Sequence, residues 1–140
     1  MVDTKGDSGR TDAVTRLLDH FSAGDFDQAI ALFSDDIEVR LPFQDERTGF
    51  WSHAGGKDNV RRLFNGVASM FDPHPLYIDE LLSATDGKTV IARYHGDFRA
   101  RNTGKPYRNT YIAVFEFDDG LIRSWTEFHN PTVLAEALSP

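Results

Sequence analysis

Four strand-like runs separated by three short turn signals occupy the second half of this chain and constrain its fold most. The turn signals are Asp86-Gly87, Asn102-Thr103-Gly104 and Asp118-Asp119-Gly120. Gly, Asn and Asp tolerate the backbone angles that tight hairpins need. We therefore predict an antiparallel meander of four strands, at residues 76–84, 89–101, 107–117 and 121–129. Asn130-Pro131 ends the last strand, and a final helical turn follows, indicated by Leu134 and Leu138.

The first half of the chain instead repeats its apolar residues at helical spacing. A first helix begins at Thr11 or Asp12 and ends at Gly24, and its apolar face is Val14, Leu17, Leu18 and Phe21. A second helix begins with a capping-box-like pair, Asp25 and Gln28, and its apolar face is Phe26, Ala29, Ile30 and Phe33. A third begins near residues 56–58 and carries one apolar stripe, made of Val60, Leu63, Phe64, Val67 and Phe71.

The order of these elements predicts the fold class. A short strand at residues 37–41, ended by Pro42, and a long loop at residues 43–55 separate the second and third helices. Helices first and strands afterwards are typical of α+β domains in which helices cover one face of a sheet. We predict a cone-shaped α+β fold with three N-terminal helices packed on a curved, mainly antiparallel sheet. Residues 11–140 form this single domain, and residues 1–10 form a flexible polar tail.

The composition excludes several classes of partner and site. The 140-residue chain has a net charge of −7, so it repels phosphate backbones and we expect no nucleic acid partner. It contains no Cys, which excludes disulfides and thiolate metal sites. It has neither an apolar run of about 18 residues nor a signal peptide, so we expect a cytoplasmic protein without membrane contact. Phosphate-loop and metalloprotease motifs are absent, and we expect neither a cofactor nor a metal ion.

The register of the predicted hairpins places a candidate site on one face of the sheet. If residues 118–120 form a three-residue loop, Glu127 lies opposite Tyr111. If residues 102–105 form a four-residue loop, Gly96 also lies opposite Tyr111. Side chains alternate between faces, so one face carries Tyr94, Gly96, Phe98, Asn109, Tyr111, Ala113, Trp125, Glu127 and His129. A one-residue error in either loop would exchange this face for the charged one.

A lone carboxylate on that aromatic face is the main functional signal. The aromatic face must look toward the helices, where Glu127 loses hydration and its pKa rises. A carboxyl group with a pKa near neutrality can both accept and donate a proton. We interpret Glu127 as a general acid or base. The alternative is a buried carboxylate that is held by Asn109 or Tyr111 and binds a ligand without chemistry.

Three sets of motifs carry a resemblance to a known superfamily. Ala23-Gly24-Asp25-Phe26-Asp27, followed by Ala31-Leu32-Phe33, resembles the helix pair of ketosteroid isomerases. Thr103-Gly104-Lys105 and Trp125-Thr126-Glu127-Phe128 resemble the sheet of limonene epoxide hydrolases. The ending Glu127-Phe128-His129-Asn130 is similar to that of the phenazine biosynthesis A/B proteins. Together they resemble the nuclear transport factor 2-like superfamily and its SnoaL-like members, over nearly the whole chain from Thr11 onward.

The resemblance implies a selective set of site residues. The oxyanion-binding Tyr and the catalytic Asp of ketosteroid isomerases correspond here to Leu17 and Leu41, so ordinary ketosteroid isomerisation is not expected. Their second oxyanion-hole acid corresponds to Asn109, which can still donate a hydrogen bond. The Arg and Asp that flank the attacking water in the epoxide hydrolases correspond to Tyr94 and Gly96.

The same comparison supports Glu127 as the acid. The last acid of the epoxide hydrolases and the catalytic Glu of the phenazine proteins both correspond to Glu127. The second catalytic residue of the phenazine proteins, a His on the third helix, has no counterpart here, since Leu63 or Phe64 stands near its position. The resemblance further implies a setting in bacterial secondary metabolism.

Other residues carry alternative interpretations. His129 is a candidate proton relay or orienting group, and otherwise a histidine at the pocket rim. Trp51 and His53 are candidates to cover the pocket mouth, and otherwise anchor a surface loop. His95 and Asp97 alternate on the opposite face, but two ligands without a third are weak evidence for a metal site.

We therefore expect a cofactor-free acid/base enzyme that cyclises, isomerises, dehydrates or condenses a hydrophobic, polycyclic or aromatic substrate. Glu127 would move the proton, and Asn109 and His129 would stabilise or relay charge. The substrate-binding residues would be Tyr94, Phe98, Tyr111 and Trp125 on the sheet, with Trp51, His53, Leu17 and Leu41 around them. The alternatives are a non-catalytic binding protein for an apolar metabolite, and epoxide opening by Glu127 alone.

The charged face of the sheet predicts an oligomer. The exposed face of a curved sheet is usually covered by another element or another chain. The resemblance implies a dimer formed through this surface, as in members of the superfamily. We expect a homodimer with Arg93, Asp97 and Glu116 at or near the interface.

Overall fold

The computed structural model describes residues 7–45 and 51–140, which form four helices and one six-stranded sheet. The helices are α1 (Asp7–Ala23), α2 (Phe26–Ile30), α3 (Lys57–Met70) and α4 (Pro131–Leu138). The strands are β1 (Phe33–Arg40), β2 (His53–Gly55), β3 (Leu76–Ser83), β4 (Thr89–Arg99), β5 (Pro106–Asp118) and β6 (Leu121–Phe128).

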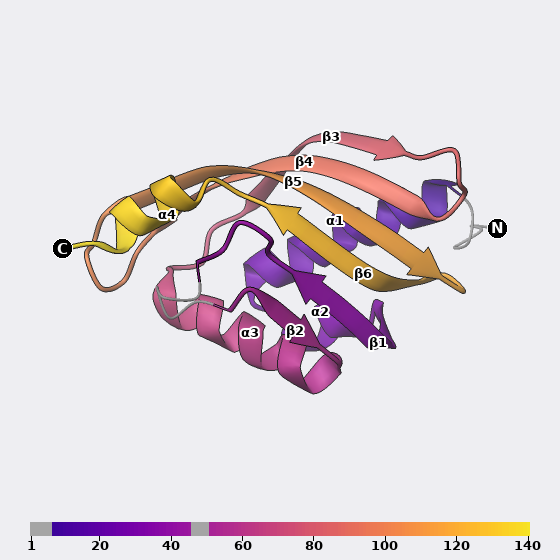
Figure 1. Cartoon of the computed structure of the whole chain (residues 1–140), viewed down its shortest axis with the longest axis horizontal. Coiled ribbons are helices and arrows are strands. Elements are labelled where there is room, and N and C mark those ends of the chain that lie inside the picture. The colour runs from indigo at the N-terminus through magenta and orange to yellow at the C-terminus, as the bar shows by residue number, and fades with distance from the viewer. Residues whose placement is uncertain (1–6, 46–50) are drawn as a thin grey trace.

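The strands are ordered β2-β1-β6-β5-β4-β3, as Figure 1 shows. Only β1 and β6 are parallel, and every other neighbouring pair is antiparallel. The predicted α+β class and mainly antiparallel sheet are therefore confirmed. No helix of the described residues is long and apolar enough to cross a membrane.

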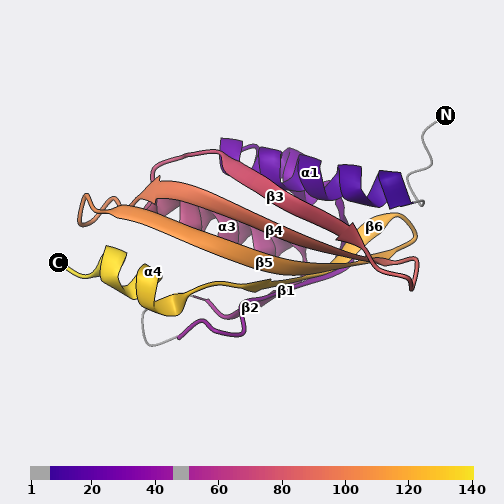
Figure 2. The same cartoon turned by 90° about the horizontal axis from the view of Figure 1, so that it is seen from above.

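The core lies between the inner face of the sheet and the helices α1, α2 and α3. Strand β5 alternates between buried and less buried positions along most of its length, so one of its faces is directed into the core. The rings of Phe64 on α3 and Phe115 on β5 both pack against Trp125 on β6, with centroids 6.1 Å and 5.4 Å away. Figures 1 and 2 show α4 apart from the other helices, at the end of the sheet where β4 turns into β5.

Helix α4 is fixed to that turn and extends the core there. Thr103 Oγ1 donates a hydrogen bond of 2.6 Å to the Ala137 carbonyl oxygen. Beneath α4 lies a second apolar cluster, which contains Phe71, Ala100, Tyr107, Leu134 and Ala137. Asn130 caps the helix by accepting from the backbone N–H groups of Thr132 and Val133. The predicted final helical turn is thus confirmed, and it closes one end of the sheet.

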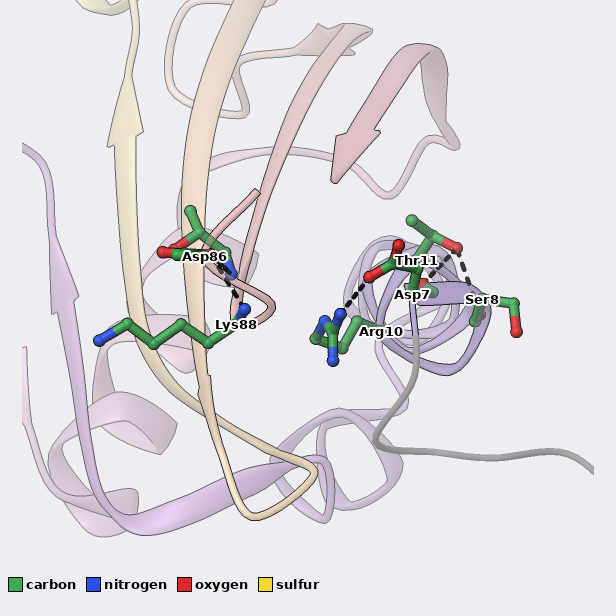
Figure 3. Close-up of polar contacts among 7 residues, drawn as sticks. Asp7, Ser8, Arg10, Thr11, Asp86 and Lys88 are labelled. Carbon is green, nitrogen blue, oxygen red and sulfur yellow. Dashed lines mark hydrogen bonds and ion pairs between the residues drawn. The ribbon is translucent and has the colours of Figure 1, made fainter. Parts of the chain in front are cut away.

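The first helix begins earlier than predicted. Helix α1 begins at Asp7, and Arg10 in its first turns is buried and paired with Asp7 (Figure 3). The Thr11 hydroxyl donates to the carbonyl oxygens of Asp7 and Ser8, at 3.1 and 3.2 Å, as a residue inside a helix does. The prediction that Thr11 or Asp12 caps this helix is therefore wrong. Residues 7–10 belong to the helix and not to the predicted tail, whose residues 1–6 lie outside the described part.

Two predictions about the next elements are also corrected. Asp25 precedes α2 but accepts no capping hydrogen bond, and α2 ends at Ile30, so Phe33 begins β1 instead. The predicted loop at residues 43–55 contains β2, whose His53 pairs with Arg40 of β1. This pairing supplies partners for the outer edge of β1, which an uninterrupted loop would leave open.

The turn signals gave the positions of the hairpins but not their loop lengths. In the β3–β4 turn, Asp86 Oδ1 accepts from the backbone N–H groups of Lys88 and Thr89, both at 2.9 Å; Figure 3 shows the contact with Lys88. In the β5–β6 turn, Asp118 pairs with Leu121, so the loop has two residues and not three. Those two residues, Asp119 and Gly120, have positive φ angles of 51° and 81°, the angles that a tight hairpin needs.

The predicted register is wrong by two residues in both hairpins. A bulge lies beside the short β5–β6 turn, and together they place Glu127 opposite Ala113 instead of Tyr111. The β4–β5 pairing ends at Arg99 and Pro106, which leaves a six-residue loop and places Tyr94 opposite Tyr111. Because side chains alternate with a period of two, a two-residue error leaves the same residues on the inner face.

Candidate active site

A cavity of about 100 Å³ lies between the inner face of the sheet and helices α1, α3 and α4. Aromatic rings form much of its wall: Phe21, Phe64, Phe71, Phe98, Tyr94, Tyr107, Tyr111 and Trp125. Aliphatic side chains complete the apolar part: Val39, Leu41, Leu63, Val67, Leu76 and Leu134. Gln44, Glu127 and His129 are the remaining lining residues, so among the described residues of the wall Glu127 is the one carboxylate and no Lys or Arg is present.

The Glu127 carboxylate is held by a hydrogen bond from β4, a strand that does not pair with β6. Glu127 on β6 lies opposite Ala113 on β5, and Tyr94 on β4 lies opposite Tyr111. The Tyr94 side chain is fully buried and stacks on Tyr111 with ring centroids 5.3 Å apart. Its hydroxyl group donates a hydrogen bond to Glu127 Oε2. This hydrogen bond therefore joins β4 to β6 across the intervening strand β5.

Burial dominates the electrostatics of Glu127. Loss of hydration raises its pKa from 4.5 to about 7, although the hydrogen bond from Tyr94 acts in the opposite direction. Its side chain is only partly exposed and lines the cavity. Glu127 is therefore present in both its charged and its neutral form near pH 7.

The tyrosines of the wall remain protonated and can donate hydrogen bonds. Burial, and then the charge of Glu127, raises the pKa of Tyr94 well above its ordinary value. The Trp125 indole N–H lies near the Tyr94 hydroxyl and opposes this rise, but it makes no hydrogen bond of normal geometry. Burial also raises the pKa of Tyr107 to about 12 and that of Tyr111 well above 10.0.

His129 faces the same cavity and has both ring nitrogens buried. The residue is 7% exposed, and neither Nδ1 nor Nε2 has a hydrogen-bond partner in the described part of the chain. Burial lowers its pKa below 6.5, so the neutral imidazole, with one donor and one acceptor nitrogen, is favoured near pH 7. It follows Glu127 by two residues and lies directly after the end of β6.

Asn109 supports the site from behind and does not line the cavity. Its Nδ2 donates to the Tyr107 hydroxyl at 2.8 Å and to the Asn130 carbonyl oxygen at 3.1 Å. Its Oδ1 accepts from the backbone N–H groups of Thr110 and Asn130, at 3.0 and 3.3 Å. The amide is thereby saturated. The structure therefore shows Asn109 holding Tyr107 and the Asn130 backbone and facing no free space of the cavity.

The structure brings most of the predicted site residues together. The cavity wall contains Glu127, His129, Tyr94, Phe98, Tyr111, Trp125 and Leu41. Leu17, in contrast, is fully buried in the core away from the wall. Trp51 is 40% exposed, and the His53 ring is hydrogen-bonded to Glu38, so neither lines the cavity. The structure therefore places these three predicted substrate-binding residues away from the cavity wall.

Sequence reasoning missed Tyr107 as a residue of the cavity wall. Tyr107, Asn109 and Tyr111 alternate along β5, so the period of two already places Tyr107 on the inner face. Tyr107 lines the cavity and is only 5% exposed.

The charged outer face offers no metal site in the part of the chain that is described. His95 Nδ1 lies 2.9 Å from Asp79 Oδ2, and Arg108 Nε lies 3.1 Å from Asp97 Oδ1. His95 and Asp97 thus have separate partners and do not converge on one point.

Residues 14–125 match the family model described as a SnoaL-like domain. The chain belongs to the SnoaL-like family. A curated relative of this SnoaL-like protein, the uncharacterized protein YesE of Bacillus subtilis, is 34% identical over 116 residues, which cover 76% of this chain and 78% of YesE.

Solved structures show how widely the SnoaL-like fold is shared. A proposed isomerase from Bacillus subtilis superimposes with a TM-score of 0.81 at 23% identity, covering 91% of this chain and 90% of that one. An NTF2-like protein of unknown function from Burkholderia pseudomallei gives 0.85 at 15% identity, covering 99% and 100% of the two chains. The fold is also shared with a proposed polyketide cyclase and an epoxide hydrolase. At these identities the likeness establishes the fold alone.

Proposed function

We propose that this SnoaL-like protein is a cofactor-free acid/base enzyme in which Glu127 moves a proton to and from a hydrophobic substrate. One observation carries the proposal: among the described residues of the aromatic cavity wall Glu127 is the one carboxylate, and burial brings its pKa to about 7. General acid/base catalysis is most effective when the pKa of the catalytic group is near the working pH.

The surrounding residues have complementary roles. Tyr94 fixes one carboxylate oxygen by its hydrogen bond, which leaves Glu127 Oε1 to exchange a proton with substrate. Neutral His129 supplies a second polar group in the same wall. Isomerisation, cyclisation, dehydration and condensation can all begin with removal or delivery of a proton. These reactions are therefore the class we propose.

Deuterium exchange tests this proposal without knowledge of the natural substrate. Small ketones such as cyclohexanone exchange their α-hydrogens in D₂O when a general base removes them, and mass spectrometry follows the uptake. We expect the wild type to accelerate exchange and Glu127→Gln to lose that acceleration by roughly 10²-fold or more. Arg93→Gln, on the outer face, is the matched control and should exchange as the wild type does. If Glu127→Gln accelerates exchange as well as the wild type, the proposal is wrong.

A non-catalytic binding protein is the second candidate function. It is favoured by the presence of only one carboxylate among the described residues of the cavity wall, because many acid/base enzymes use two ionised groups. Ligand binding without any exchange by the wild type would support it. Epoxide opening is less favoured, because Tyr94 and Gly96 occupy the positions of the groups that would position the water, and the described wall contains no Arg.

A further inference from the structure

We infer that the cavity binds a compact neutral carbonyl compound, whose oxygen accepts hydrogen bonds from the Tyr107 hydroxyl and His129. This inference rests on the proposed function, because it names the substrate class of the same cavity. The oxygen would lie apart from Glu127, which would then face a hydrogen elsewhere on the ligand.

The hydrogen bonds at Tyr107 leave its hydroxyl proton available to a ligand. The Tyr107 oxygen accepts from Asn109 Nδ2 at 2.8 Å and from the Tyr111 hydroxyl at 3.2 Å. A phenol oxygen accepts at most two hydrogen bonds and donates one. Its proton has no acceptor in the described part of the chain, and Tyr107 lines the cavity. The two incoming hydrogen bonds also polarise the O–H bond and make it a stronger donor.

His129 provides a second group that awaits a partner. The residue is 93% buried and lines the cavity, and neither of its ring nitrogens has a hydrogen bond within the described part of the chain. Buried polar groups in native proteins are nearly always satisfied. A ligand oxygen would accept from the N–H of the neutral ring. Two independent observations, at Tyr107 and at His129, therefore point to an oxygen acceptor in the ligand.

The charge and the size of the cavity further restrict the class of ligand that it can bind. No Lys or Arg occurs among the described lining residues, so a carboxylate ligand would meet Glu127 without a compensating cation. An anionic ligand is therefore disfavoured, and the carbonyl compound that we propose is neutral. A protein cavity of about 150 Å³ can hold benzene, and the cavity here has about 100 Å³. A single ring is therefore the upper limit of what the cavity holds without a shift of its walls, and the polycyclic substrate expected from the sequence would have to extend well beyond it.

Two probes of equal shape test the oxygen subsite. Cyclohexanone carries the carbonyl oxygen, and methylenecyclohexane replaces it by a CH₂ group. Binding is followed by Trp125 fluorescence in a Trp51→Phe background, in which Trp125 is the single tryptophan. We expect Tyr107→Phe to weaken cyclohexanone binding about fivefold to tenfold, the value of one buried hydrogen bond, and to leave methylenecyclohexane within about twofold. His129→Leu should have the same selective effect, and the exposed Tyr77→Phe should have none.

The carbonyl stretching frequency of bound ¹³C-labelled cyclohexanone gives a direct second readout. Hydrogen bonding lowers this frequency, so it should rise in Tyr107→Phe and, by a smaller amount, in Tyr111→Phe, which removes only one donor to Tyr107. The bicyclic 1-decalone should bind at least about tenfold more weakly than cyclohexanone. The inference is overturned if the carbonyl frequency is unchanged in both Tyr107→Phe and Tyr111→Phe, or if Tyr107→Phe weakens the binding of both probes equally. It is also overturned if neither probe binds, or if 1-decalone binds as tightly as cyclohexanone.

The test of the oxygen subsite can fail or succeed separately from the test of acid/base catalysis by Glu127. Glu127→Gln should bind cyclohexanone within about threefold of the wild type, because the carbonyl is held by other residues. If the wild type binds cyclohexanone with the lowered frequency but does not accelerate deuterium exchange, the subsite stands and the catalytic proposal fails. If exchange is accelerated but Tyr107→Phe changes neither affinity nor frequency, the subsite fails and the catalytic proposal stands.

Discussion

The Tyr94 hydroxyl on β4 donates a hydrogen bond to the Glu127 carboxylate on β6, across the intervening strand β5. It fixes the carboxylate within an aromatic wall and stabilises its charged form. Burial has the larger effect, so the balance leaves the Glu127 pKa at about 7.

Removing this hydrogen bond should make Glu127 a weaker acid. In Tyr94→Phe the charged carboxylate loses its donor, and we expect its pKa to rise from about 7 to about 8. Carbon-detected NMR titration of the Glu127 carboxyl resonance measures the change. Tyr111→Phe is the control, because the Tyr111 hydroxyl donates to Tyr107 and not to Glu127. A fall in the pKa of Tyr94→Phe would contradict the assigned role of Tyr94.

Glu127 should also make stability depend on pH. Its pKa is 4.5 in the unfolded reference and about 7 in the folded protein, so the folded state binds this proton more tightly. The stabilisation from protonation is complete below pH 4.5 and is lost as the pH rises through about 7. The difference corresponds to about 3 kcal/mol of unfolding free energy.

Urea denaturation at pH 5 and pH 8 checks this dependence. Between these two values the wild type should lose about 2–3 kcal/mol relative to Glu127→Gln, which cannot titrate at this position. His129, whose folded pKa is lowered, acts with the opposite sign, but it is present in both proteins and cancels. Parallel pH profiles for the two proteins would show that Glu127 does not titrate in a buried site.

A side chain at Gly96 should disturb the cavity wall. A Cβ atom there would lie 2.3 Å from Phe98 Cε2 and 3.1 Å from Leu76 Cδ2, and both residues line the cavity. We expect Gly96→Ala to cost about 1–3 kcal/mol of unfolding free energy and to weaken ligand binding. Gly66→Ala is the matched control, since nothing lies within 4 Å of its Cβ position in helix α3, and it should stabilise by up to about 1 kcal/mol. Equal stability of the two variants would contradict the packing described for Phe98.

The outer face of the sheet leads us to propose a homodimer. Three apolar side chains on it remain about half exposed, namely Tyr77, Leu82 and Ile112 at 46%, 49% and 47%. Arg93 lies beside Ile112 in the sheet and pairs with Asp79 and Glu80 of the same chain. Light scattering after size-exclusion chromatography should give twice the mass of one chain, and Ile112→Glu should shift it toward the monomer. A wild type that elutes only as a monomer would refute the dimer.

Alternation along the strands explains why the inner face could be predicted although the pairings could not. Both hairpin registers were wrong by two residues, and an even error preserves the face. The loop lengths depended on a bulge beside Phe117 and on the six residues between Arg99 and Pro106, which turn residues alone do not encode. The three-residue strand β2 was missed because so short a segment has no periodic pattern.

Side-chain partners were harder to predict than faces. Asn109 was correctly placed on the inner face, but its hydrogen bonds to Asn130 and Tyr107 depend on how the chain turns after β6. The hydrogen bond from Tyr94 to Glu127 joins two strands that are not neighbours, so it becomes apparent only with the correct register. Glu127 itself could be predicted, because one carboxylate on an aromatic face is a signal that local sequence contains.

The pKa of Glu127 in the wild type, measured by carbon-detected NMR titration with Glu127→Gln to assign the resonance, tests the central claim most directly. If Glu127 is a buried carboxylate that exchanges a proton with substrate, its pKa should be about 7. A value near 4.5, the ordinary value for Glu, would show that Glu127 is solvated, and the proposed acid/base role would then be contradicted.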